Sequence, residues 1–202
     1  MFDLSFLQLL TRAIATIVVL TLMGFCVAGF ARLLGDRGPA YDGKLTLNPF
    51  VHVDIFGLFA GTVGRVGWVR PIAIDPAKGR IGRATPVVVA LLSMAAVFFF
   101  GRLVLLALPW VATSWPTSSA AFTDATIRMM ADVAAWTLAI NIIPIPPLLG
   151  GYLLFALAPG AHQWLVKRHL YVSIALTVVI VLIYPSLPAT PFGDLARFLG
   201  AR

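Results

Sequence analysis

The sequence contains no glutamate, and all eight of its acidic residues are aspartates. A mechanism that needs a glutamate as general base is therefore excluded, and with it the H-E-x-x-H motif, in which two histidines bind zinc beside that glutamate. The chain also has a single cysteine, Cys26. One cysteine can form neither an intramolecular disulfide nor a metal cage built from thiolates. Two common routes to a metal site are thus closed.

Charge is scarce as well, because only 11% of the residues are charged whereas 60% are hydrophobic and the mean hydropathy is +0.95. A soluble globule of 202 residues would need more polar surface, so the composition predicts an integral membrane protein surrounded by a lipid bilayer. The net charge of +7 would suit a nucleic-acid partner. The cations are, however, spread through short loops between apolar segments, which is typical of cytoplasmic loops, and we expect no nucleic-acid partner.

Long apolar runs predict an all-α polytopic membrane protein with about four to five transmembrane helices. The candidate spans cover approximately residues 13–34, 85–111, 125–143, 148–157 and 170–187. Residues 43–74 mix polar residues and glycines with β-branched residues, which predicts a re-entrant, β-hairpin-like loop.

We interpret residues 1–202 as a single membrane domain. Its core covers about residues 13–187, and an amphipathic tail over about residues 190–202 is expected to lie on the membrane surface. Cations gather in loops 65–83 and 159–169, and both loops are therefore expected on the cytoplasmic side.

The proline-rich stretch from Asn141 to Gly151, N-I-I-P-I-P-P-L-L-G-G, interrupts the apolar sequence. Proline cannot continue a helix, because it lacks the amide hydrogen and clashes with the preceding turn. At membrane depth, broken backbone is tolerated only where it is buried in protein or lines a cavity. This stretch is therefore the strongest candidate for a functional site.

The same stretch resembles the N-x-x-P-x-x-P-x-D-G-G signature of the site-2 proteases, a family of intramembrane zinc metalloproteases. Residues 43–54, G-K-L-T-L-N-P-F-V-H-V-D, resemble the G-x-L-T-L-N-P-x-x-H-x-D run of the bacterial branch. Residues 67–76, G-W-V-R-P-I-A-I-D-P, resemble its G-W-x-x-P-V-P-V-N-P loop. The resemblance implies a site-2 protease-like core and a multi-pass protein of the bacterial (cell) inner membrane.

The resemblance also implies that the metal site has been lost. In the family, H-E-x-x-H lies just upstream of a Gly-Asp pair, and counting back from Gly35-Asp36 places it on Met23-Gly24-Phe25-Cys26-Val27. Met23, Gly24 and Val27 cannot replace two histidine ligands and a glutamate base, and Leu149 stands where the third ligand, an aspartate, is expected. We therefore expect no catalytic residue, no metal ligand and no cofactor, although active relatives hold zinc.

Four polar residues remain candidates for a groove that binds substrate: Asn48, His52, Asp54 and Asn141. In an extended stretch, His52 and Asp54 would face the same side, where they would contact a peptide or hold the loop in shape. Asn141 would point into the central cavity and hold an extended peptide or cap broken backbone. Arg128 and Asp132 have the i,i+4 spacing of an ion pair on one helix.

Two classes of function follow. The preferred hypothesis is a pseudoenzyme, a membrane binding or scaffold protein, or an accessory subunit, whose partner is another membrane protein or a transmembrane peptide segment. The alternative is an intramembrane zinc metallopeptidase that cleaves transmembrane segments with unorthodox ligands, drawn from Met23, Cys26, His52, His162 and His169. A small transporter is a third hypothesis, but the sequence shows no inverted repeat.

Overall fold

The computed structural model describes residues 5–201, and of Ser118 only the backbone. Residues 1–4 and 202, which the sequence analysis included in the membrane domain, lie outside the described residues. The described elements are all helical, as predicted, and the β-pairing found within residues 5–201 is one isolated antiparallel bridge between Val53 and Val69. The longer helices are α1 (Phe6–Leu33), α4 (Ile55–Gly64), α5 (Thr85–Leu103), α7 (Thr117–Asn141), α9 (Pro159–Lys167), α10 (His169–Ile183) and α11 (Pro191–Leu199). The short α-helices are α2 (Gly38–Tyr41), α3 (Pro49–His52), α6 (Leu108–Ser114) and α8 (Gly151–Leu157), and the 3-10 helices are η1 (Gly82–Ala84), η2 (Val104–Ala107) and η3 (Leu187–Ala189).

Two helical stretches within residues 5–201 are long and apolar enough to cross a membrane: α1 and the continuous stretch Gly82–Ser114. A third span results if α9 and α10, which meet at an angle of 84°, are counted as one bent element. The spans expected over residues 125–143 and 148–157 correspond to α7 and the short α8, neither of which meets the same test. In α7 the reason is polarity, because Asp124, Arg128 and Asp132 interrupt the apolar sequence.

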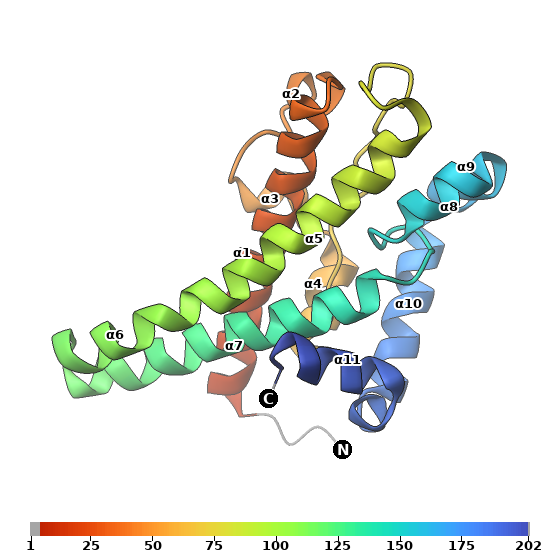
Figure 1. Ribbon diagram of the computed structural model, residues 1–202. Helices are drawn as coiled ribbons and strands as arrows, with labels where there is room; N and C mark the ends of the chain where they lie inside the picture. Colours follow the sequence, from red (N-terminus) through yellow and green to blue (C-terminus); the bar gives the residue numbers. More distant parts are fainter. Residues whose placement is uncertain (1–4, 202) are drawn as a thin grey trace.

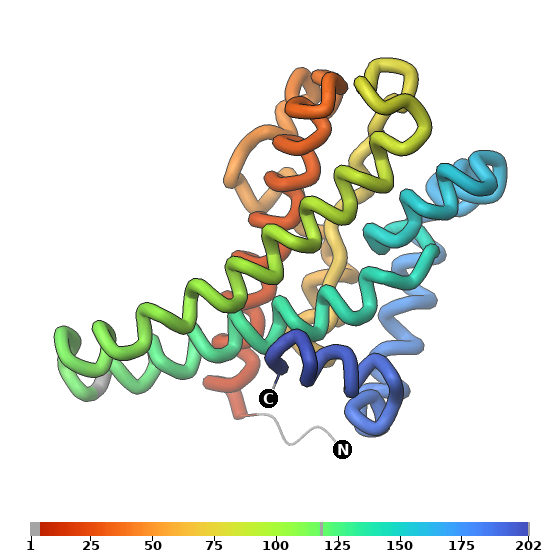
Figure 2. The backbone as a smooth tube through the Cα atoms, in the orientation of Figure 1, coloured from red at the N-terminus to blue at the C-terminus, as the bar shows by residue number. Residues whose placement is uncertain are grey.

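The core lies where α1 packs against α4, α5 and α7. Helices α5 and α7 run side by side in opposite directions, and α1 crosses them (Figures 1 and 2). The α8–α9 pair stands beside this group, and α11 packs on α7. Within the tail, α11 is amphipathic and buries Ala196 against the protein.

The β-hairpin-like loop predicted within residues 43–74 is not confirmed, because α3 and α4 occupy part of this region and its β-pairing is limited to the bridge between Val53 and Val69. The side-chain oxygen of Asn48 accepts a hydrogen bond from the amide of Phe50 at 3.1 Å and thereby caps α3. The carboxylate of Asp54 caps α4 by accepting from the amides of Phe56 (2.9 Å) and Gly57 (3.0 Å). Polar residues of this kind favour helix starts as strongly as turns, and here they start two helices.

The glycines of α4 form a packing surface for neighbouring segments. A Cβ atom added to Gly57 would lie 2.9 Å from the backbone nitrogen of Trp68, and one added to Gly61 would lie 2.8 Å from Oγ1 of Thr16. Real Cβ atoms do not approach other atoms so closely, so only glycine allows these contacts. A glycine-rich pattern that resembles a loop therefore serves close helix packing, with the glycines on one face of the helix.

Candidate functional site

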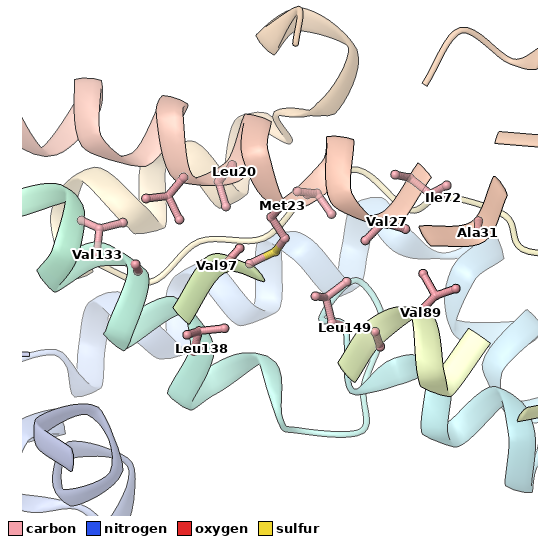
Figure 3. Packing of buried hydrophobic residues seen from close by; sticks show 14 of the residues in the cluster. Leu20, Met23, Val27, Ala31, Ile72, Val89, Val97, Val133, Leu138 and Leu149 are labelled. Atoms are coloured by element: carbon pink, nitrogen blue, oxygen red, sulfur yellow. The ribbon is translucent and has the colours of Figure 1, made fainter. Parts of the chain in front are cut away.

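The proline break returns Leu149 to the middle of the molecule, against α1. Met23 and Val27 lie four residues apart on one face of α1. Met23, Val27 and Leu149 are 0%, 0% and 2% exposed and belong to one apolar cluster (Figure 3). The three positions that the resemblance assigns to metal ligands are thus buried in one apolar cluster.

The side chain of His52 fills the space beside Gly24. A Cβ atom added to Gly24 would lie 2.6 Å from Cγ and 2.8 Å from Cβ of His52, and closer still to Nδ1. The ring is held there by Nε2, which lies 2.7 Å from the carbonyl oxygen of Thr46. A glutamate at position 24, as the resemblance would require of an active enzyme, cannot fit unless His52 moves. Sequence reasoning did not connect these two residues, which belong to different helices.

The imidazole of His52 is fully buried. Its Nε2–H donates to Thr46, which leaves Nδ1 as a lone-pair nitrogen with no hydrogen-bond partner among the described residues. Burial lowers the pKa of His52, and this effect outweighs the hydrogen bond to the Thr46 carbonyl, which raises it. A proton on Nδ1 would face the backbone of α1 without an acceptor.

Acidification should therefore destabilise the protein through His52. Because the pKa of His52 is lower in the folded chain than in the unfolded chain, its contribution to stability is complete above about pH 6.5 and is lost as the pH falls toward the lowered value. We expect the Tm of the wild-type protein to fall between about pH 6.5 and pH 5 more steeply than that of His52→Gln. His169→Gln, at an exposed position, is the matched control and should keep the wild-type slope. Equal slopes for all three proteins would contradict this prediction.

Asn141 is fully buried and has hydrogen bonds to three backbone groups. Its side-chain nitrogen donates to the carbonyl oxygens of Gly67 (2.9 Å) and Thr137 (2.8 Å). Its side-chain oxygen accepts from the amide of Leu149 at 3.0 Å. In this arrangement the side chain caps the broken backbone and ties the end of α7 to the proline break and to the segment that follows α4.

The four residues considered for a substrate groove each have hydrogen bonds to backbone groups of the protein. Asn48 is exposed and caps α3, and Asp54 caps α4. The expectation that His52 and Asp54 face one side of an extended strand is wrong, because His52 ends one helix and Asp54 precedes the next. In this structure Asn141 supports the backbone of the proline break, Asp54 supports the start of α4, and His52 binds the backbone of Thr46.

The ion pair predicted between Arg128 and Asp132 is replaced by two others. Arg128 pairs with Asp124 at 2.7 Å, the arrangement in which the acid precedes the base along the helix and which the helix dipole favours. Asp132 pairs with Arg65 at 2.7 Å, across the gap between α7 and the end of α4. The guanidinium of Arg65 also lies 5.3 Å from the ring centre of Trp136. Arg65, predicted to be a loop cation, is thus the ion-pair partner of Asp132 inside the fold. The sequence signal for such a partner is an acidic residue on a helix that packs in the core.

A pocket of about 360 Å³ lies next to Leu149. One wall is the extended segment 69–74, and the other is formed by residues 146–149 together with α8 and α9. The hydroxyl of Tyr152 donates to the carbonyl oxygen of Ile72 at 2.6 Å and joins the two walls. Because the walls are more than 70 residues apart in the sequence, no local pattern indicated this pocket.

The residues that are present do not fit a zinc ion. Within residues 5–201, no group of three or more histidine, cysteine or aspartate side chains is placed to hold a metal. His52 is hydrogen-bonded to Thr46. His162 lies in the wall of the pocket and packs against Phe155, with ring centres 5.0 Å apart. Zinc needs at least three converging protein ligands, so the unorthodox set proposed above is not assembled here.

Comparison with known proteins gives one distant relative to set beside this geometry. The chain is 26% identical over 180 residues to the "Putative zinc metalloprotease YwhC" of Bacillus subtilis (strain 168), and the alignment covers 87% of this chain and 82% of the relative. No family model and no solved structure matches the chain. The chain is therefore distantly related to a protein described as a putative zinc metalloprotease.

Proposed function

We propose that this chain is a catalytically inactive, site-2 protease-like membrane protein that binds other membrane proteins or their transmembrane segments without cleaving them. It would act as a scaffold or as an accessory subunit. The observation that carries this proposal is the burial of Met23, Val27 and Leu149 in one apolar cluster. A metalloprotease needs three ligands and an open coordination position for water at this place, and three apolar side chains provide neither.

The surroundings of Gly24 support the same proposal independently. The catalytic glutamate of the resemblance would have to project from this position, where His52 fills the available space. Asn141 nevertheless bonds to the backbone of Gly67 and Leu149, and Asp54 caps α4. A fold whose scaffold persists while its reactive groups are replaced is suited to binding rather than to hydrolysis.

For the location, we propose the bacterial inner membrane with loops 65–83 and 159–169 on the cytoplasmic side. Segments of both loops line the same pocket, so they lie at the same end of the molecule, as Figure 1 also shows for the start of α5 and for α9. Apart from Arg65, which pairs with Asp132 inside the fold, the cations of these loops favour the cytoplasmic face.

The alternative, an active zinc metallopeptidase, is favoured by the description of the Bacillus relative as a zinc metalloprotease. That description concerns a protein that is 26% identical to this one. For this chain the alternative would require a metal site assembled from residues that the structure keeps apart.

Metal analysis separates the two functions. We expect the full-length protein, purified in mild detergent without chelators, to contain far less than one zinc per chain when its metal content is measured by inductively coupled plasma mass spectrometry. A chelator should leave its Tm unchanged, because the fold does not rely on metal ligands. About one tightly bound zinc per chain, or a fall in Tm on chelation, would contradict the proposal that the protein is catalytically inactive. Chemical cross-linking in membranes should then capture a membrane protein that remains uncut.

A further inference from the structure

The pocket between segment 69–74 and α9 is apolar inside and basic at its edges. Its lining includes Ile72, Leu149, Tyr152 and Phe155. A volume of about 360 Å³ is at the lower end of the range for pockets that bind small molecules, roughly 300–1,000 Å³. The pocket can therefore hold a chain-like apolar group but not a folded partner.

The charge of the lining selects for an anion. Arg70 comes from one wall and Lys167 from the other, and both side chains belong to exposed residues. The residues that line the pocket include no aspartate to neutralise them. His162 adds a buried Nδ1 that has no hydrogen-bond partner among the described residues. An anionic group in the pocket would be balanced by the two cations.

The backbone of the pocket is poorly suited to an extended peptide. Strand addition depends on main-chain amides that are free to donate, and Pro71, Pro146 and Pro147 in the two walls carry none. The amide of Arg70 already donates to the carbonyl oxygen of His52 at 2.8 Å. Binding must then come from apolar contact and from the charged mouth, which favours an amphiphile.

The helix that forms one wall has the features of a membrane interface. Trp164 on α9 is 55% exposed, and the guanidinium of Arg168 lies 4.3 Å from the centre of its ring. Tryptophan and basic residues gather at the level of lipid headgroups. The 84° bend to α10 would let α9 lie along that surface while α10 enters the bilayer.

We propose that this pocket binds an anionic phospholipid of the surrounding bilayer. The phosphate lies between Arg70 and Lys167, and a segment of one acyl chain packs against Ile72, Leu149 and Phe155. The basic side chains make the site selective for net negative headgroups over zwitterionic ones. The proposed lipid site does not depend on whether the protein binds zinc at positions 23, 27 and 149.

Photolabelling in nanodiscs tests the proposal. The full-length protein is reconstituted in phosphatidylcholine with a trace of phosphatidylglycerol or phosphatidylcholine that carries a photoreactive group in its acyl chain. We expect the phosphatidylglycerol probe to label peptides from residues 69–74 and 152–167 several times more strongly than the phosphatidylcholine probe. Arg70→Gln/Lys167→Gln should lower this labelling by about fivefold for each cation removed. Ala73→Trp, at an exposed position in the wall, should block labelling of both walls without disturbing the core.

The control is Lys78→Gln/Arg83→Gln, which removes the same charge from exposed positions outside the pocket and should label like the wild type. Equal labelling by the two headgroups, or wild-type labelling of the Arg70/Lys167 double variant, would overturn the proposal. Loss of labelling on addition of inorganic phosphate would identify a soluble anion instead. Displacement of the probe by a synthetic transmembrane peptide, with the two cations making no difference, would identify a peptide site.

Discussion

Replacing Gly24 with alanine should lower the free energy of unfolding by about 1–3 kcal/mol, the cost of overpacking a rigid core. The added methyl group would meet Cγ and Cβ of His52 at 2.6 and 2.8 Å. Rotation of the ring alone cannot relieve a contact with Cβ, so the backbone of α3 or of α1 has to shift. Elsewhere in a helix the same change is favourable by roughly 1 kcal/mol, because alanine has the higher helix propensity. Reversible unfolding in mixed micelles would measure the difference.

Gly29→Ala, on the same helix, is the matched control. Its Cβ would lie 3.7 Å from the side chain of Leu45, an ordinary contact, so this variant should be neutral or slightly more stable. The double variant Gly24→Ala/His52→Gly should recover most of the loss, because it removes the colliding ring. Equal effects of the two glycine substitutions, or no recovery in the double variant, would show that His52 does not occupy this space. For the same reason, restoring His, Glu, His and Asp at positions 23, 24, 27 and 149 should create a metal site only if His52 is replaced as well.

Leu149→Asp should destabilise the protein by roughly 2–4 kcal/mol, since it buries a carboxyl group without a partner. Leu149 is 2% exposed and packs in the cluster that contains Met23 and Val27. Leu149→Met, which conserves volume and polarity, should cost less than about 1.5 kcal/mol. Both values come from the same unfolding measurement.

A neutral effect of Leu149→Asp would indicate that the space around position 149 is open to water. If Leu149→Asp is neutral and a cysteine introduced at this position reacts readily with water-soluble reagents, the site is an open, wet groove. That outcome would contradict the burial of position 149 on which the proposal of an inactive protein rests, and it would favour a retained cavity for a peptide.

The sequence predicted the parts of this structure that depend on local chemistry. Apolar runs predicted the helices, and three prolines in an apolar setting predicted that the chain breaks after Asn141. Met23, Val27 and Leu149, the positions that the resemblance assigns to metal ligands, lie in one cluster. Each of these features is encoded within a few residues.

The parts that were missed depend on partners far away in the sequence. Nothing near Arg65 indicates that it pairs with Asp132, 67 residues further on. The glycines of α4 look like those of a loop until Trp68 and Thr16 are placed against them. Likewise, Asn48 and Asp54 are equally suited to turns and to helix caps, and only the packing of α3 and α4 decides between the two.

The hydrogen bonds of Asn141 have a consequence for which substitutions the chain can tolerate. Its partners are the backbone groups of Gly67, Thr137 and Leu149, and every residue type carries the carbonyl groups while all but proline carry the amide. The shape of the proline break is therefore independent of the side chain at position 149. A residue there can change from a metal-binding acid to leucine while the loop keeps its course, whereas Asn141 itself has no such freedom.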